Sequence, residues 1–220
     1  MIRAVLFDMD GTLLDTETHS FAFHEGVCRA LGLTLTRSFF AGLMGRSEEE
    51  IAKLVDKEFG GRYEWLKTRQ AAKEYKLAQL ENGTLALRPG TEECLRALQA
   101  MGIKIGLVTS TEAAQVKKYI AAFPALQNCF DAMIRGSESP LPKPSPVPFL
   151  LCAEKLGLSP AECMGVEDGA AGLRSIRAAG MTSVFVPDFL TMSEQLAPYV
   201  DYELHSLAEL PQIIRQRNQA

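Results

Sequence analysis

Three short apolar runs, each followed by polar residues, stand out along the chain: Ile2–Phe7, Ile103–Val108 and Cys163–Val166. Runs of this length, rich in branched and aromatic residues, are typical of strands buried on both faces of a parallel sheet. Sheets of this class bind their ligands at the carboxyl ends of the strands. The polar residues that follow each run are therefore the first candidates for a functional site.

Between the first two runs the pattern changes to helical periodicity. Apolar residues recur three and four positions apart, with charged residues between them, in three segments: Phe21–Leu31, Glu48–Phe59 and Tyr63–Leu80. Ser47, with Glu50 three residues later, forms a capping box that predicts a helix start just after the turn at Gly42–Gly45. Residues 16–85 are thus predicted to form a helical bundle inserted into a sheet domain.

From Pro89 onward, predicted helices and strands alternate. The expected order is helix, strand, helix, strand, helix, strand, helix, strand, over Glu92–Met101, Ile103–Val108, Ala113–Phe123, Ala132–Ile134, Pro146–Leu156, Cys163–Val166, Ala170–Ala179 and Ser183–Val186. Such alternation specifies a parallel sheet with helices on both faces. The predicted fold is α/β, with a Rossmann-like parallel sheet core of residues 1–15 and 86–220 and an inserted helical-bundle cap of residues 16–85.

Composition narrows the class of protein. The formal net charge of -4 over 220 residues, without a Lys or Arg run, argues against a nucleic-acid surface. There is no run of eighteen apolar residues, and the chain starts directly in a strand, so we expect a cytoplasmic protein without a membrane partner. A monomer is the expected state. Five cysteines without a C-x-x-C pair indicate buried small hydrophobes, and three scattered histidines make a zinc site unexpected.

The first polar cluster places two carboxylates, Asp8 and Asp10, two residues apart at a strand end. Like charges this close repel, and one carboxylate is pushed towards its neutral form unless a cation intervenes. A hard divalent cation such as magnesium offsets that cost and leaves one carboxylate free as a nucleophile. An ordinary turn is the alternative, because Asp and Gly are common turn residues.

Four motifs together decide between these interpretations. The sequence has DMDGT at 8–12, VTS at 108–110, Lys143 within LPKPSP, and VEDGAAG at 166–172. In this order they resemble the four motifs of the haloacid dehalogenase superfamily, and the linked set is far more specific than any one piece. The resemblance extends from Ile2 to about Val186. The spacing of the first two motifs is similar to the subgroup with a helical cap, which includes sugar phosphatases and β-phosphoglucomutase.

The resemblance implies a role for each core residue. Asp8 is the expected nucleophile, which also gives one oxygen to magnesium, and no histidine is placed to activate a serine or cysteine instead. Asp10 is expected to act as general acid and base, with its main-chain carbonyl on the metal. Thr109 and Ser110 are expected to cradle the phosphoryl oxygens with hydroxyl and N–H donors, although residues of these types before a helix are commonly N-caps.

Three further charged residues complete the expected core site. Lys143, between two prolines, would hold a positive charge at the transferring group, whereas a lone loop lysine is ordinarily solvated. Asp168 is an expected magnesium ligand, and Glu167 is either a ligand or an orienter of the metal waters. Helix capping is the alternative for both acidic residues.

Two residues of the predicted cap have open roles. Arg46 lies in a Gly-flanked loop, where its guanidinium could bind the distal oxygens of the substrate, but a solvated arm is the alternative. His19 follows the expected hinge, one residue before the place where related cap patterns carry a histidine.

The pattern favours a magnesium-dependent phosphatase that acts on a small phosphorylated metabolite, a sugar or polyol phosphate. Dehalogenases have no use for Asp10, and phosphonate hydrolases require a cap lysine. The alternative is a β-phosphoglucomutase-type phosphomutase, but Met44 and Glu48 occupy the places of the lysine and arginine that grip its second phosphate. A non-catalytic binding protein would be expected to lack Asp8 or Asp10.

Overall fold

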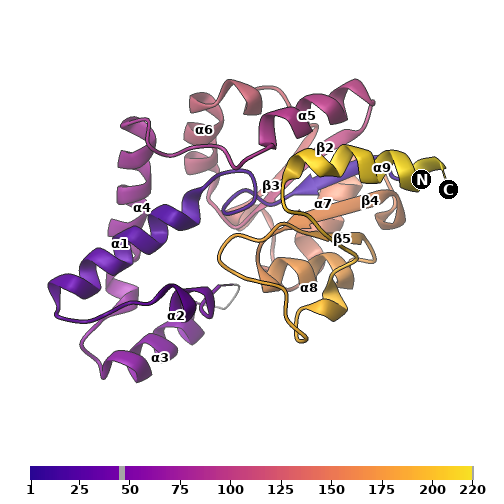
Figure 1. The fold of residues 1–220 in the computed structure, drawn as a ribbon. Coiled ribbons are helices and arrows are strands. Elements are labelled where there is room, and N and C mark those ends of the chain that lie inside the picture. Colours follow the sequence, from indigo (N-terminus) through magenta and orange to yellow (C-terminus); the bar gives the residue numbers. More distant parts are fainter. Residues whose placement is uncertain (45–47, 220) are drawn as a thin grey trace.

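The chain folds around a six-stranded parallel sheet in the computed structural model, which describes residues 1–44 and 48–219 (Figure 1). The strand order is β3-β2-β1-β4-β5-β6, and every neighbouring pair is parallel. The strands are β1 (Ala4–Phe7), β2 (Lys104–Thr109), β3 (Ala132–Arg135), β4 (Cys163–Glu167), β5 (Thr182–Phe185) and β6 (Tyr202–Glu203). Because β1 is central, the polar residues that follow it lie between those that follow β2 and β4.

Helices cover both faces of the sheet, as the alternation predicts. Successive strand side chains point to opposite faces, so Val5 and Phe7 pack with α5 (Thr91–Ala100), α6 (Ala113–Ala122) and α9 (Leu210–Gln219). Ala4 and Leu6 pack with α7 (Val147–Leu156) and α8 (Ala170–Ala178) on the other face. Short 3₁₀ turns occupy Pro124–Leu126, Gly136–Glu138, Pro160–Glu162, Ala197–Tyr199 and Leu207–Glu209. The predicted α/β fold is confirmed.

Four helices form a separate bundle beside the sheet (Figure 1): α1 (Thr16–Ala30), α2 (Arg37–Ala41), α3 (Glu48–Phe59) and α4 (Trp65–Glu81). The bundle has its own apolar cluster, which includes Phe40, Val55 and Trp65. Phe189, from the loop after β5, is buried in the same cluster and lies 5.2 Å from Phe40 between ring centroids. The loop after β5 therefore ties the bundle to the sheet domain.

The two chain crossings between sheet and bundle run side by side. Leu14 and Leu87 form an antiparallel bridge. On one side of it, the amide of Asp15 donates to the carbonyl of Ala86 over 3.0 Å. On the other side, the amide of Arg88 donates to the carbonyl of Leu13 over 2.9 Å. The domain boundaries at 15/16 and 85/86 stay a prediction.

Several elements differ from their predicted bounds. Helix α1 begins at Thr16, five residues before the predicted Phe21. Apolar spacing misses this first part of the helix because the buried stripe is not an apolar series; it consists of Thr16, Ser20, His24 and Cys28. The short helix α2, the two-residue strand β6 and the polar helix α9 were not predicted at all. The expected capping box of Ser47 lies outside the described residues.

Two properties of the structure bear on the predictions made from composition. All five cysteines are free and buried, as expected for small hydrophobes. Within residues 1–44 and 48–219, no helix combines the length and apolar character needed to cross a membrane.

Candidate active site

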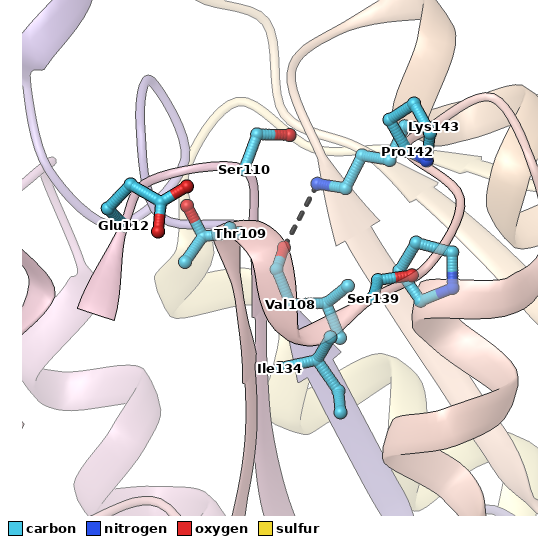
Figure 2. A pocket seen from close by; sticks show the side chains of 10 residues that line it. Val108, Thr109, Ser110, Glu112, Ile134, Ser139, Pro142 and Lys143 are labelled. Carbon is cyan, nitrogen blue, oxygen red and sulfur yellow. Dashed lines mark hydrogen bonds between the residues drawn. The ribbon is translucent and has the colours of Figure 1, made fainter.

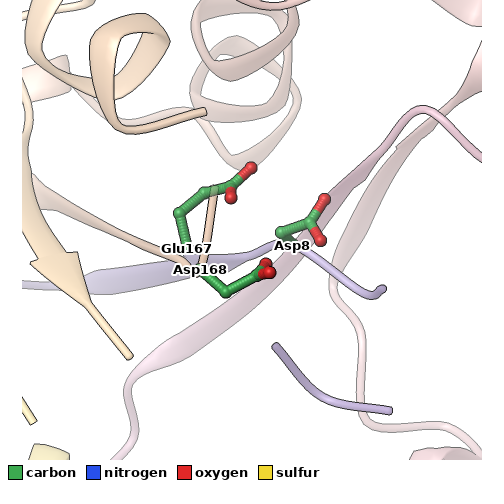
Figure 3. Close-up of side chains that lie close together, drawn as sticks. All are labelled: Asp8, Glu167 and Asp168. Atoms are coloured by element: carbon green, nitrogen blue, oxygen red, sulfur yellow. The ribbon is translucent and has the colours of Figure 1, made fainter. Parts of the chain in front are cut away.

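Three buried carboxylates meet at the centre of the sheet edge, as Figure 3 shows. Asp8 follows β1, and its amide donates to the carbonyl of Val166 over 3.0 Å, which fixes its backbone beside β4. Glu167 ends β4, and Asp168 is the next residue. Oxygen atoms of Asp8, Glu167 and Asp168 lie within 4.8 Å of one another. The parallel register thus joins two motifs that are more than 150 residues apart in the sequence.

Lys143 places one positive charge among these carboxylates. Its Nζ donates to Asp8 Oδ1 over 2.6 Å and to Glu167 Oε1 over 2.6 Å. A third bond, of 3.0 Å, goes to the carbonyl of Val108 at the end of β2 (Figure 2). The side chain is 9% exposed. The solvated-loop alternative for this lysine is therefore wrong.

The electrostatics of the cluster favour an additional cation. Burial raises the pKa of Asp8 well above its ordinary value; Lys143 counteracts this, whereas Glu167 adds to it. Burial also raises the pKa of Asp168, and Glu167 and Asp8 raise it further. Desolvation works to lower the pKa of Lys143, but Asp8 and Glu167 raise it above its ordinary value. Three ionised carboxylates and one ammonium carry a net charge of two negatives, which a divalent cation would neutralise.

Asp10 lies two residues after Asp8, and both residues line a cleft at this edge of the sheet. The Thr111 hydroxyl donates to Asp10 Oδ2 over 2.6 Å. Asp10 Oδ1 is buried, and within the described part of the chain it has no hydrogen-bond partner. The Thr109 hydroxyl accepts from the amide of Thr111 over 3.0 Å and so shapes the turn that presents Thr111. Thr111 has no role predicted from the sequence, although it directly follows the VTS motif.

Two glycines make room for the carboxylates. Gly11 has a φ of +79°, and a Cβ at this position would lie 2.4 Å from Asp168 Oδ2. The neighbouring Thr12 hydroxyl donates to Asp168 Oδ1 over 3.0 Å. Gly172 is tighter still, because a Cβ there would lie 1.8 Å from Glu167 Oε1. The glycines of both acidic motifs are therefore required by the positions of the carboxylates.

The structure also decides the helix-capping alternatives. Helix α6 begins at Ala113 with Glu112 at its N-cap, so Thr109 and Ser110 lie before the cap position. Helix α8 has Gly169 at its N-cap, and no side chain caps it. The amide of Gly169 instead donates to Glu167 Oε2 over 2.9 Å. Capping is thus not the role of the threonine and serine or of Asp168.

A cleft of about 720 Å³ lies between the sheet edge and the helical bundle. Seven of the eight predicted site residues line it: Asp8, Asp10, Thr109, Ser110, Lys143, Glu167 and Asp168. The eighth, Arg46, lies outside the described residues. The bundle contributes Glu17, Met44, Glu49, Glu50 and Arg69 to the described lining, and α8 contributes Arg174. His19 is not among the described residues that line this cleft.

A smaller cavity of about 220 Å³ adjoins the cleft (Figure 2). It shares Thr109, Ser110, Pro142 and Lys143 with the cleft, and Ile134 and Glu112 line it as well. Ser110 therefore borders both the cleft and the smaller cavity.

Comparison with known proteins gives a consistent result. A model of the haloacid dehalogenase-like hydrolases matches residues 2–180. The chain is 32% identical to YhcW of Bacillus subtilis (strain 168), whose name assigns it provisionally to the phosphatases, over 96% of this chain and 94% of the relative. It is 30% identical to hexitol phosphatase B of Escherichia coli (strain K12), over 95% and 94%.

A solved structure extends the likeness to three dimensions. The crystal structure of CbbY from Rhodobacter sphaeroides in complex with phosphate superposes with a TM-score of 0.77. The two sequences are 28% identical, and the match covers 96% of each chain.

Proposed function

Since the chain belongs to the haloacid dehalogenase-like hydrolases and is an enzyme of the phosphatase class, we propose that it is a magnesium-dependent phosphatase of sugar or polyol phosphates. The observation that carries the proposal is the buried cluster of Asp8, Glu167 and Asp168 around Lys143, with Asp10 facing the same cleft. The relatives support the substrate class, because one is named a hexitol phosphatase and the CbbY crystal structure contains phosphate.

The proposed metal site uses oxygen ligands throughout. Asp8 and Asp168 would hold magnesium directly, together with the main-chain carbonyl of Asp10. Glu167 already binds Lys143 through Oε1 and the amide of Gly169 through Oε2, so we assign it to orienting the metal waters. Bound magnesium would neutralise the carboxylates and withdraw negative charge from the phosphoryl oxygens.

The proposed first step forms an aspartyl phosphate. A carboxylate oxygen of Asp8 attacks phosphorus, and the bond between phosphorus and the leaving oxygen breaks. Asp10 donates a proton to that oxygen, so the product leaves as a neutral alcohol. Lys143 holds Asp8 in place, while Thr109 and Ser110 offer hydroxyl and N–H donors to the phosphoryl group.

Water completes the proposed reaction. Asp10, now a carboxylate, accepts a proton from the water that attacks phosphorus, and the bond to Asp8 breaks to release inorganic phosphate. The Thr111 hydroxyl donates to Asp10 Oδ2 and so orients the carboxylate that carries out both proton transfers.

The direct test is phosphate release from a panel of phosphorylated metabolites, with and without magnesium. We expect hexitol and sugar phosphates to be hydrolysed, activity to stop when a chelator is added, and magnesium to restore it. Full activity of the chelated enzyme would contradict the proposal.

A phosphomutase is the alternative, and the bundle side of the cleft argues against it. A mutase must grip a second phosphate with two cations, and Met44, which lines the cleft, stands at the sequence position of the expected lysine. Phosphorus NMR of the enzyme with a hexose 1-phosphate and magnesium separates the two. We expect free phosphate to appear first, and faster appearance of the 6-phosphate isomer would favour the mutase. A cytoplasmic location and a monomeric state stay predictions.

A further inference from the structure

Glu17 lies in the first turn of α1, two residues past Asp15, and lines the cleft from the side of the helical bundle. Among the described residues, no hydrogen bond or ion pair engages its carboxylate. Its exposure to solvent is intermediate, and it belongs to the residues that line the cleft. Glu17 is therefore a half-buried, cleft-lining residue whose carboxylate has no hydrogen-bond partner within the described part of the chain.

The surroundings make this position costly for a carboxylate. Burial raises the pKa of Glu17 to about 7, against the influence of Lys76, and the carboxylates of Asp10, Asp188 and Asp15 add to the rise. A carboxylate that destabilises the native state and forms no hydrogen bond or ion pair within the described protein has no structural role that would explain an acidic residue at this position. Its place in a cleft beside catalytic groups points to contact with a ligand.

We infer that Glu17 is a specificity-determining residue, which accepts hydrogen bonds from hydroxyl groups of the leaving group next to the phosphoester. The inference rests on the proposed function and deepens it. The phosphoryl group must contact Asp8, and Asp10 must reach the leaving oxygen. Glu17, in the first turn of α1, lines the same cleft as Asp8 and Asp10, and the charge of Asp10 acts on its carboxylate. A leaving group whose oxygen reaches Asp10 therefore extends into the cleft that Glu17 also lines.

An acceptor in this position discriminates by hydroxylation. An ionised carboxylate has only acceptor oxygens, and a polyol supplies adjacent hydroxyl donors for them. An alkyl leaving group of the same length would desolvate the carboxylate and give it no partner. Sites built to hydrogen-bond a hydroxyl reject analogues without it far more strongly than apolar pockets reject small differences in shape. Glu17 thus selects polyol and sugar phosphates over alkyl phosphates.

The test compares hexitol 6-phosphate with n-hexyl phosphate, which share a six-carbon chain and differ in hydroxyl groups. We expect wild type to prefer the hexitol phosphate in kcat/KM by at least about tenfold. Glu17→Ala should lower that ratio about tenfold or more, chiefly through a higher KM for the hexitol phosphate. Glu17→Gln, which keeps one acceptor oxygen, should lower it less. The matched control is Glu25→Gln on the same helix, where the carboxylate pairs with Arg29 on the surface.

The outcomes separate this inference from the proposed function. A proportional loss on both substrates in Glu17→Ala, or an unchanged ratio, would overturn the specificity role. Equal use of both substrates by wild type would overturn it too, while the phosphatase activity stood. If wild type failed to hydrolyse even p-nitrophenyl phosphate, the proposed function itself would fail, and this inference with it.

Discussion

Lys143 Nζ lies 2.6 Å from Asp8 Oδ1, although 135 residues separate the two in the sequence. The lysine neutralises one carboxylate where three are buried together, and it holds Asp8 from the side of β2. A fixed cation there stabilises negative charge as phosphorus is attacked. The pair therefore joins the stability of the site to its chemistry.

Replacing this lysine should affect both activity and stability. We expect Lys143→Met to lower kcat by about a hundredfold or more. The free energy of unfolding at pH 8 should fall by about 3–5 kcal/mol, because Asp8 and Glu167 are left buried without their partner. The loss should shrink as pH falls and the carboxylates become protonated. Steady-state kinetics and urea denaturation at pH 8 and 5 measure these effects. Activity within tenfold of wild type would exclude the assigned role.

Asp168 should control the magnesium requirement. It contributes one of the three clustered carboxylates, and Thr12 orients it. We expect Asp168→Ala to raise the magnesium concentration for half-maximal rate by at least about tenfold. Glu154→Ala, an exposed carboxylate on α7, is the control and should leave the requirement unchanged. Identical magnesium titrations of the two variants would show that the metal site has been misassigned.

Gly172 should be intolerant of even one methyl group. A Cβ there would lie 1.8 Å from Glu167 Oε1, so Gly172→Ala must displace the carboxylate that binds Lys143. We expect a loss of about 1–3 kcal/mol in unfolding free energy, together with a large fall in kcat. The control is Gly26→Ala in α1, where nothing lies within 4 Å of the added methyl. That change should be neutral or stabilise the protein by up to about 1 kcal/mol. Equal stability of both variants would contradict the packing described for Glu167.

His24 should make the helical bundle sensitive to acid. Its ring stacks on Trp65 at 3.9 Å between centroids, it is hydrogen-bonded to the Tyr63 hydroxyl, and burial lowers its pKa to about 3. Between pH 6.5 and 3 the unfolded chain binds a proton at this residue and the native state does not, so stability is lost as pH falls. From pH 7 to 5 the loss should be about 2 kcal/mol.

His24→Gln removes this titration and serves as the comparison. The raised pKa of Glu17 has the opposite effect on stability as pH falls. Because Glu17 is present in both proteins, its contribution cancels when they are compared. Urea denaturation at pH 7 and 5 should show a loss about 2 kcal/mol greater in wild type than in the variant. An equal change in the two proteins would place the imidazole in a solvated environment.

The sequence motifs predicted the core of the site because a parallel sheet brings strand ends together. Asp8, Thr109 and Glu167 follow or end apolar runs, and the register of β1 with β2 and β4 aligns them without further information. Lys143 is different, because it lies in a loop whose path no periodicity specifies. Only the resemblance distinguished it from a solvated lysine.

Other features depend on packing that a pattern does not encode. Thr111 acquires its contact with Asp10 through the turn that follows β2. The buried face of α1 is a polar stripe that includes His24, so apolar spacing marked the helix start five residues late. The place of Glu17 in the cleft depends on how the bundle sits over the sheet edge. These positions follow from tertiary contacts rather than from local sequence.

The central claim is that Asp8 is the nucleophile, and turnover by Asp8→Asn tests it most directly. The amide cannot attack phosphorus, and it removes one charge from a repulsive cluster, so the protein should stay folded. We predict that phosphate release from hexitol 6-phosphate with saturating magnesium falls by about a thousandfold or more, with circular dichroism and thermal unfolding like those of wild type. Peptide mass spectrometry should first show that Asn at position 8 of the variant has not deamidated to Asp. Phosphate release within tenfold of wild type by that protein would contradict the account.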